Sequence, residues 1–399
     1  MHDAIPLPVP GQPKSVRPSA VLGFFLVHVA ALGVLFTGFS WKGVLLCVGS
    51  YYLRMFAVTA GFHRYFAHRT YRMGRVPQFL MAFLGQTAAQ KGVLWWASHH
   101  RLHHKYSDTP RDVHSPIVNG FWWAHVGWIL SGRYEDTDET KIPDFAKFPE
   151  LRWLDRNQYA ATLVYALALF FAFSWTGLVW GYFLSTVLLW HGTFSINSVM
   201  HLFGRRVFPT ADQSRNSFVM ALATMGEGWH NNHHFYPGSA AQGFRWWEVD
   251  GSYYLLWLLQ RIRLVRNLRP APSRATLSLL DAARSARTRL DAALEAAGGQ
   301  IAEAVEQLSR RWEALKGAAR ESALQVLADL ETAREGASLR LERLQGDYAL
   351  ALDRAGTVAE QRLEELRAEI ERARRQLAEA LAHLVEAAER LGLPEALPA

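Results

Sequence analysis

Nine of the sixteen histidines fall in four short segments, which read HRYFAH, HRLHH, NSVMH and HNNHH. In HRLHH and HNNHH the offsets of zero, three and four residues place three rings on one face of a helix, where they can converge on a metal pair. His63 and His68 are five residues apart, so we expect the helix to end or bulge between them. The nine candidate ligands are His63, His68, His100, His103, His104, His201, His230, His233 and His234.

This many imidazoles predict two metal ions. Neutral imidazole binds Fe, Zn, Cu and Ni, and four to six ligands complete one coordination sphere. The only cysteine, Cys47, lies in an apolar run, which excludes a thiolate site and a disulfide framework. Zinc hydrolysis would need a general base, and only Glu227 is adjacent. Two irons bound mainly by histidine fit best, although a single HxxHH could also be a solvated helix face.

The elements that must position these histidines are membrane helices. Residues 20–39 carry no formal charge and span about 30 Å as a helix, the thickness of a bilayer core. A second apolar run, 43–60, contains Arg54, which we expect to pair near the site or to snorkel outward. Residues 159–175 and 178–196 form a second pair. The sequence predicts an all-α integral membrane protein with four transmembrane helices in two hairpins and a cytoplasmic helical cap that holds the histidines.

The positive-inside rule predicts the orientation. Basic residues precede the first span and follow the second, so both termini and all four histidine segments are expected on the cytoplasmic side. Residues 78–96 are apolar but contain Gln86, Gln90 and Lys91, which indicates an interfacial or partly re-entrant segment rather than a fifth span. Residues 253–269 are aromatic and then basic, as expected of an interfacial helix.

The C-terminal part has a different composition. After Pro270 and Pro272 the chain is rich in Ala, Leu, Glu and Arg, and apolar residues recur at steps of three and four over 359–391. This pattern predicts a coiled coil and self-association. We expect an N-terminal segment at 1–18, a membrane domain at 19–270 and a helical extension at 271–399. The net charge of +7 on an apolar chain favours a membrane partner over nucleic acid, for which no motif is present.

The ordered motifs closely resemble the membrane fatty-acid desaturase family of the stearoyl-CoA Δ9-desaturase type. The resemblance covers roughly residues 20–260 and includes TAGFHRYFAHR, HHKYSDT, HVGW and GEGWHNNHH. It implies two iron ions, O₂ as co-substrate, two external electrons, and a cis double bond introduced into a saturated C16–C18 acyl chain. The nine histidines carry over as metal ligands, and Asn197 as the residue that holds a water on one iron.

The motifs specify the residues that contact the substrate less clearly than the metal ligands. An apolar tunnel among the four spans would fix one carbon of the chain and exclude water, and Cys47 and Tyr51 lie at depths where they could floor it. Ser98 and His99 stand where the animal acyl-CoA enzymes carry Arg and Asp, so acyl-CoA, acyl-carrier-protein and acyl-lipid substrates stay open. The residues expected to contact the substrate or its carrier are Cys47, Tyr51, Lys91, His99, Arg101 and Lys105.

Three rival readings remain. A hydroxylase on the same scaffold would use the same oxidant, a metal transporter would bury its ligands in mid-span, and a scaffold protein would have lost part of the ligand set. Electrons are expected from a separate ferredoxin, cytochrome b5 or flavoprotein reductase. Asn231 and Asn232, between the histidines of HNNHH, are expected to face away as spacers, after a bend at Gly226 and Gly228.

Overall fold

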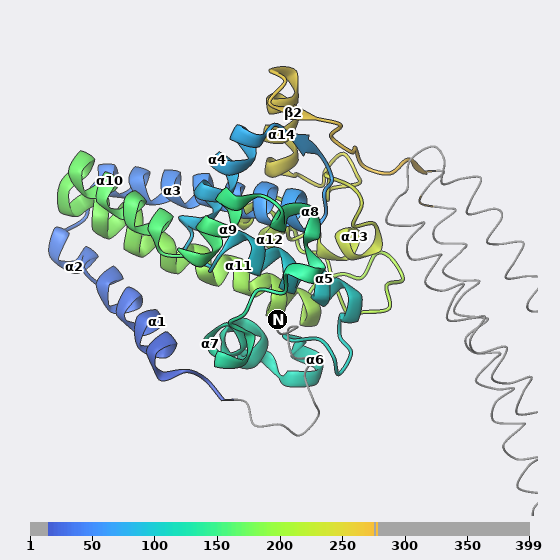
Figure 1. The fold of residues 1–399 in the computed structure, drawn as a ribbon, viewed down its shortest axis with the longest axis horizontal. Coiled ribbons are helices and arrows are strands. Elements are labelled where there is room, and N and C mark those ends of the chain that lie inside the picture. The colour runs from blue at the N-terminus through green and yellow to red at the C-terminus, as the bar shows by residue number, and fades with distance from the viewer. Residues whose placement is uncertain (1–14, 275–276, 278–399) are drawn as a thin grey trace, which may run out of the picture. The chain divides into compact units, whose positions relative to one another are not determined.

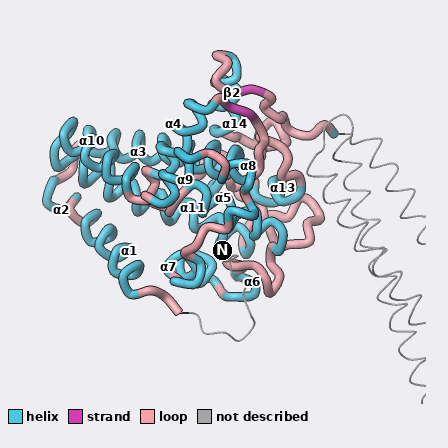
Figure 2. Tube along the Cα trace, viewed as in Figure 1, coloured by secondary structure: helices cyan, strands magenta, loops and turns pink. Residues whose placement is uncertain are grey.

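The computed structural model describes residues 15–274 and 277. The regular elements of this part of the chain are helices joined by loops, apart from one pair of two-residue strands (Figure 2). Strand β1 (Arg72–Met73) pairs antiparallel with β2 (Val265–Arg266), which joins the segment after the first histidine motif to the end of the membrane domain. Nearly all of the predicted extension 271–399, including the coiled-coil seam at 359–391, lies outside the described residues.

Three helical stretches in the described residues are long and apolar enough to cross a membrane. The first, Pro18–Thr37, contains α1 (Pro18–Ala31) and α2 (Val34–Thr37), and the second, Trp41–Ala67, contains α3 (Trp41–Phe56) and η1 (Ala57–Ala67). The third is Ala160–Leu202. Membrane character is therefore confirmed, while the orientation in the membrane stays a prediction.

The third stretch folds back on itself. It comprises α10 (Ala160–Thr176), η5 (Gly177–Leu184) and α11 (Ser185–Leu202), and Ser174 has the non-helical angles φ 56° and ψ −149°. The hydroxyls of Thr162 and Tyr182 lie 2.7 Å apart, whereas twenty residues of straight helix would separate them by about 30 Å. The stretch thus has two arms, as the predicted pair 159–175 and 178–196 requires (Figure 1). Four crossings remain a prediction.

Arg54 neither snorkels outward nor pairs with a carboxylate of the described residues. Its side chain is fully buried, and it donates to the hydroxyls of Ser185 and Thr186 and to the carbonyl of Thr87. These bonds hold α3 against the arm formed by η5 and α11. A buried charge is tolerated only when its donors are satisfied, so Arg54 serves to fix the packing of the spans.

The remaining helices form a cap over one end of the spans. The predicted interfacial segment 78–96 is divided between two of them, α4 and α5, by a turn, and the predicted interfacial helix 253–269 is shorter, because it ends at Arg261 and leads into β2. The cap consists of α4 (Arg75–Gln86), α5 (Val93–Tyr106), α6 (Pro116–Asn119), η2 (Trp123–Gly127), α7 (Trp128–Leu130), η3 (Gly132–Tyr134), η4 (Glu139–Lys141), α8 (Pro143–Ala146), α9 (Pro149–Arg156), α12 (Phe218–Ala223), α13 (His230–Phe235) and α14 (Gly251–Arg261).

A buried ion network fastens the cap to the spans. The guanidinium of Arg64, on η1, donates to Asp250 at 2.8 Å and to Glu227 at 3.0 Å, and also to the carbonyl of Ala240. All three charged side chains are almost completely buried. Removing the cation would leave two buried carboxylates uncompensated, which costs about 3–5 kcal/mol for a buried pair. The network therefore fixes the chain around Gly226, just before HNNHH, against the helix that carries HRYFAH.

Candidate metal centre

The structure brings all nine predicted histidines together in two groups. Within each group the candidate ligand atoms lie within 4.8 Å of one another. We call them the five-histidine group, which contains His63, His68, His100, His104 and His233, and the four-histidine group, which contains His103, His201, His230 and His234.

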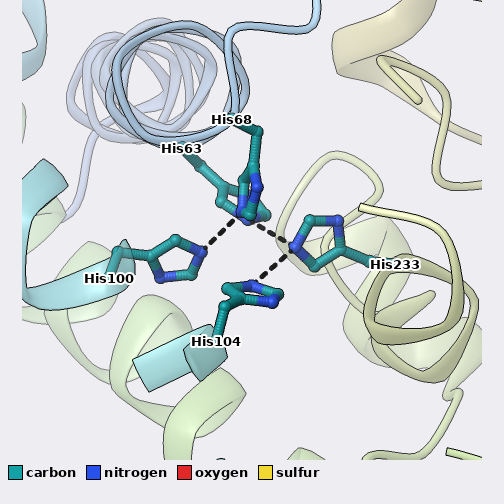
Figure 3. Close-up of side chains that lie close together, drawn as sticks. All are labelled: His63, His68, His100, His104 and His233. Atoms are coloured by element: carbon teal, nitrogen blue, oxygen red, sulfur yellow. Dashed lines mark hydrogen bonds between the residues drawn. The ribbon is translucent and has the colours of Figure 1, made fainter. Parts of the chain in front are cut away.

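In the five-histidine group the Nε2 atoms point toward a common centre (Figure 3). The Nε2 atom of His233 lies 2.9 Å from that of His63 and 3.0 Å from that of His104, and His68 and His100 approach each other at 3.0 Å. Two nitrogens bound at about 2.1 Å and at right angles around one ion would lie about 3.0 Å apart. The spacing therefore fits ligands of a single metal ion.

The four-histidine group shows the same spacing, since Nε2 of His201 lies 3.0 Å from Nε2 of His230. All four of its side chains are buried, whereas His68, His100 and His104 of the five-histidine group are only half-buried. Nδ1 of His230 and Nε2 of His234 are buried and have no hydrogen-bond partner in the described residues. For the Nε2 atom, which faces the other rings, a metal ion would supply the missing partner.

The local fold explains how His63 and His68 reach the same centre. His63 lies on η1, a π-helix, and His68 directly follows its last residue. The backbone N–H of His68 donates to the carbonyl of His63 at 3.1 Å. This bond spans five residues, so the two rings come to one side, with centroids 4.8 Å apart. The expected bulge between the two histidines is confirmed.

Each HxxHH motif divides its rings between the two groups. On α5, His100 and His104 join the five-histidine group and His103 joins the other. On α13 the arrangement is reversed, because His233 joins the five-histidine group and its neighbours His230 and His234 join the other. The two short helices therefore bridge both groups.

Three carboxylates orient the four-histidine group. Nδ1 of His201 donates to Asp108 at 2.8 Å, Nδ1 of His234 donates to Asp212 at 2.9 Å, and Nδ1 of His103 lies 3.1 Å from Asp112. A carboxylate on Nδ1 fixes the ring and leaves Nε2 free to bind a metal. In the five-histidine group the only such contact in the described residues is that of His63 with Glu227. The sequence analysis missed these aspartates; their positions just after HRLHH were the only signal for two of them.

Electrostatics favour neutral imidazole in the five-histidine group. Burial lowers the pKa of His100, His104 and His233 well below the ordinary value, and the neighbouring imidazoles lower it further. In the four-histidine group, burial likewise lowers the pKa of His230 and His234, whereas for His103 burial is outweighed by Asp112, which raises the pKa above the ordinary value. Only a neutral imidazole nitrogen can bind a metal ion, so the lowered pKa values of these rings favour cation binding at neutral pH.

The asparagines of HNNHH face away from the two histidine groups, but they do more than separate the histidines. Both are fully buried. Oδ1 of Asn231 accepts the backbone N–H groups of Val207 and Phe208, each at 2.7 Å, and Nδ2 of Asn232 donates to Glu248 at 2.8 Å. They hold α13 in place after the turn at Gly226, whose φ of 119° favours glycine. Sequence reasoning missed this role.

An apolar cavity of about 340 Å³ lies beside the five-histidine group. Its walls include Trp96, which stacks on His100 at 4.7 Å between centroids, and Asn197, which lies one helical turn before His201. Of the predicted substrate residues, Lys91 also lines it. Cys47, Tyr51, His99, Arg101 and Lys105 do not.

The five other predicted substrate residues have different surroundings. The hydroxyl of Tyr51 donates to the carbonyl of Ala223, and Cys47 is buried in the packing of α3. Arg101 is held by Asp144 and by backbone carbonyls, His99 is buried with its Nδ1 on a backbone carbonyl, and Lys105 is exposed. The expectation that Cys47 and Tyr51 floor the tunnel does not describe this cavity, because its walls come from α1, α5, α7, α10 and α11.

Comparisons with known proteins show what this chain is similar to. Residues 39–257, more than half of the chain, match the sequence model of a family described as "Fatty acid desaturase". A protein named sn-2 palmitoyl-lipid 9-desaturase from Nostoc sp. (strain 36) is 37% identical over 240 residues, which cover 59% of this chain and 84% of that protein.

Two further relatives are named after different substrates. An sn-1 stearoyl-lipid 9-desaturase from Synechocystis sp. is 35% identical over 276 residues, covering 67% of this chain and 86% of the relative. An acyl-CoA C20 Delta5-desaturase from Anemone leveillei is 35% identical over 259 residues, covering 62% and 81%. The names agree on desaturation and differ in the acyl carrier.

Proposed function

Because this chain belongs to the fatty acid desaturase family, we propose that it introduces a cis double bond, at Δ9, into a saturated C16–C18 acyl chain, with two bound irons, O₂ and two external electrons. The observation that carries the proposal is the convergence of nine histidines in two adjacent groups, beside an apolar cavity whose wall residue Trp96 stacks on His100. The position of the double bond is supported by the relatives named 9-desaturases.

The donor set fits iron. Five histidines would hold one ion, and four histidines with a water on Asn197 would hold the other. The irons would supply the oxidant needed to remove hydrogen from an unactivated methylene, which no side-chain acid or base can do.

The protein's own residues bind and orient the substrate. The cavity walls Trp95, Trp96, Trp190 and Phe194 exclude water and confine a flexible chain, and the stacking of Trp96 on His100 places one wall against the five-histidine group. The carboxylates on Nδ1 keep the rings aimed at the metals. A hydroxylase would need the same parts, so the product decides between the two activities.

We infer that the site and both chain ends face the cytoplasm, as the distribution of basic residues predicts. Electrons would then come from a soluble or membrane-bound donor on that side, such as ferredoxin, cytochrome b5 or a flavoprotein reductase.

The test is fatty-acid profiling of a host that expresses the wild type, His233→Ala or His383→Ala. His383 lies outside the family match and serves as the control. We expect new cis-alkenes with the wild type and the control, and none with His233→Ala. Hydroxy acids without alkenes would favour the hydroxylase, and identical profiles for all three would refute the catalytic site.

A further inference from the structure

The exposed residues that line the cavity lie at the beginnings of two helices, and we call this part the rim. Gly23 of α1 lines one wall, and Tyr159 and Thr162 line another at the start of α10. Helix α1 packs mainly against η5 and α11. In the stretch Pro18–Thr37 only 6% of the most apolar window is buried. One wall of the cavity is therefore a peripheral helix with its outer face toward the bilayer.

At the α1 edge of this rim, position 23 carries no side chain. Gly23 is exposed, and a Cβ atom built on it would meet nothing within 4 Å. Across the rim, the side chain of Tyr159 is 68% exposed. Both helices begin stretches that are apolar enough to cross a membrane, so this side of the cavity faces lipid at the level where the helices begin.

The charges at the rim suit a carrier with little negative charge. Among the residues that line the cavity, Arg17 and Lys91 are the only lysine or arginine side chains. Both share the carboxylate of Glu135, at 2.5 Å and 3.7 Å. Coenzyme A carries a diphosphate and a further phosphate, which proteins usually bind with several free cations. Because both cations at the rim are already paired with Glu135, the rim offers no free cation to the phosphates of such a carrier.

We propose that the acyl chain enters this cavity sideways from the bilayer, between the first turns of α1 and α10, while it is still esterified to a membrane lipid. The inference rests on the proposed desaturase function and names its substrate class. The ester and headgroup stay at the membrane surface near Arg17 and Tyr159, and the chain passes Gly23 to reach Trp96 and Asn197.

A binding experiment tests the entry route without relying on turnover. The purified full-length protein is reconstituted in phosphatidylglycerol vesicles that contain a phosphatidylglycerol with a diazirine on its palmitoyl chain. Two variants are compared, Gly23→Trp at the rim and Gly49→Trp on α3. Gly49 is also exposed and also has nothing within 4 Å of a built Cβ, but it does not line the cavity.

After illumination, mass spectrometry locates the labelled residues. We expect labelling of cavity residues in the wild type and Gly49→Trp, and a loss of about tenfold in Gly23→Trp, because the indole would stand in the path of the acyl chain at the rim. Iron content and elution volume equal to those of the wild type show that the variant is folded. Equal labelling of the cavity in all three proteins, or none in the wild type, would overturn the proposal.

An activity experiment separates this proposal from the proposed function. The iron-loaded wild type receives electrons from reduced ferredoxin and either deuterated dipalmitoyl-phosphatidylglycerol in vesicles or palmitoyl-CoA. Loss of two deuterium atoms from the intact lipid supports lateral entry. Conversion of palmitoyl-CoA alone overturns it and leaves the desaturase function standing, whereas no alkene from either substrate refutes the desaturase function itself.

Discussion

The two histidine groups differ in what lies behind the rings. In the four-histidine group, His103, His201 and His234 each have an aspartate on Nδ1, and all four rings are buried. In the five-histidine group, only His63 contacts a carboxylate among the described residues, and three rings are half-buried.

This difference implies that the two groups would hold metal ions unequally. Carboxylates on Nδ1 raise the basicity of the ligand and offset the charge of the ion. We expect the four-histidine group to hold its iron more tightly, and the five-histidine group to exchange its iron faster with the surroundings. The carboxylates themselves are kept charged: burial alone would raise the pKa of the Asp212 carboxyl, but His234 and hydrogen bonds lower it overall.

Removing one histidine from either group should have the largest effect on iron content and on alkene formation. His104→Ala and His230→Ala change one group each, because their side chains belong to different groups. We expect each variant to bind about one iron instead of about two, and to form no alkene. Iron analysis by mass spectrometry checks the counts. If one substitution removed both irons and the other removed none, two independent binding groups would be excluded.

Removing the charge of a carboxylate should have a smaller effect on iron affinity, and this effect should be confined to one histidine group. Asp212→Asn keeps the shape but loses the charge next to His234, and outer-shell substitutions typically cost 10–100-fold in metal affinity. Iron titration is expected to show one weakened site and one unchanged site. Asp144→Asn is the control, because Asp144 pairs with Arg101 and contacts no histidine. Equal weakening in both variants would contradict the role of Asp212.

Removal of iron by a chelator should distinguish the groups in the wild type. The five-histidine group is partly exposed, so about half of the iron should leave in a fast phase and the rest in a slow phase. In Asp212→Asn the slow phase should become faster while the fast phase is unchanged. Absorbance of the iron–chelator complex follows both phases, and a single phase in the wild type would contradict the difference between the groups.

Substitution of Asn197 should have the smallest effect. Asn197 is half-buried, lines the cavity and lies one turn before His201, so it can hold a water but supplies no imidazole. Asn197→Ala should keep about two irons and lower the rate of alkene formation roughly tenfold, as expected for a lost outer-shell group. Iron analysis with a product assay measures both, and loss of an iron would show that Asn197 is essential for binding.

The sequence predicted well which histidines come together, because the spacing within each motif is local. Offsets of three and four residues indicated a shared helix face, and the offset of five between His63 and His68 indicated the helical irregularity that the structure contains. The division of each HxxHH between two groups could not be predicted, because it depends on how α5 and α13 are oriented relative to each other.

The supporting residues were harder to predict. His201 and Asp108 are 93 residues apart, and Asp250 lies 186 residues from Arg64, so only the tertiary fold brings them together. The residues that line the cavity could not be predicted for a similar reason. Depth along a helix can be counted from the sequence, as it was for Cys47 and Tyr51, but the face that borders a cavity depends on the neighbouring helices.

A single-turnover experiment tests the central claim most directly. The protein is loaded with iron and reduced without oxygen, so that two ferrous ions supply the two electrons, and it is then exposed to O₂ with the saturated acyl substrate. We predict that alkene formation approaches one cis double bond for each pair of irons. No alkene from protein that holds both irons would contradict the account.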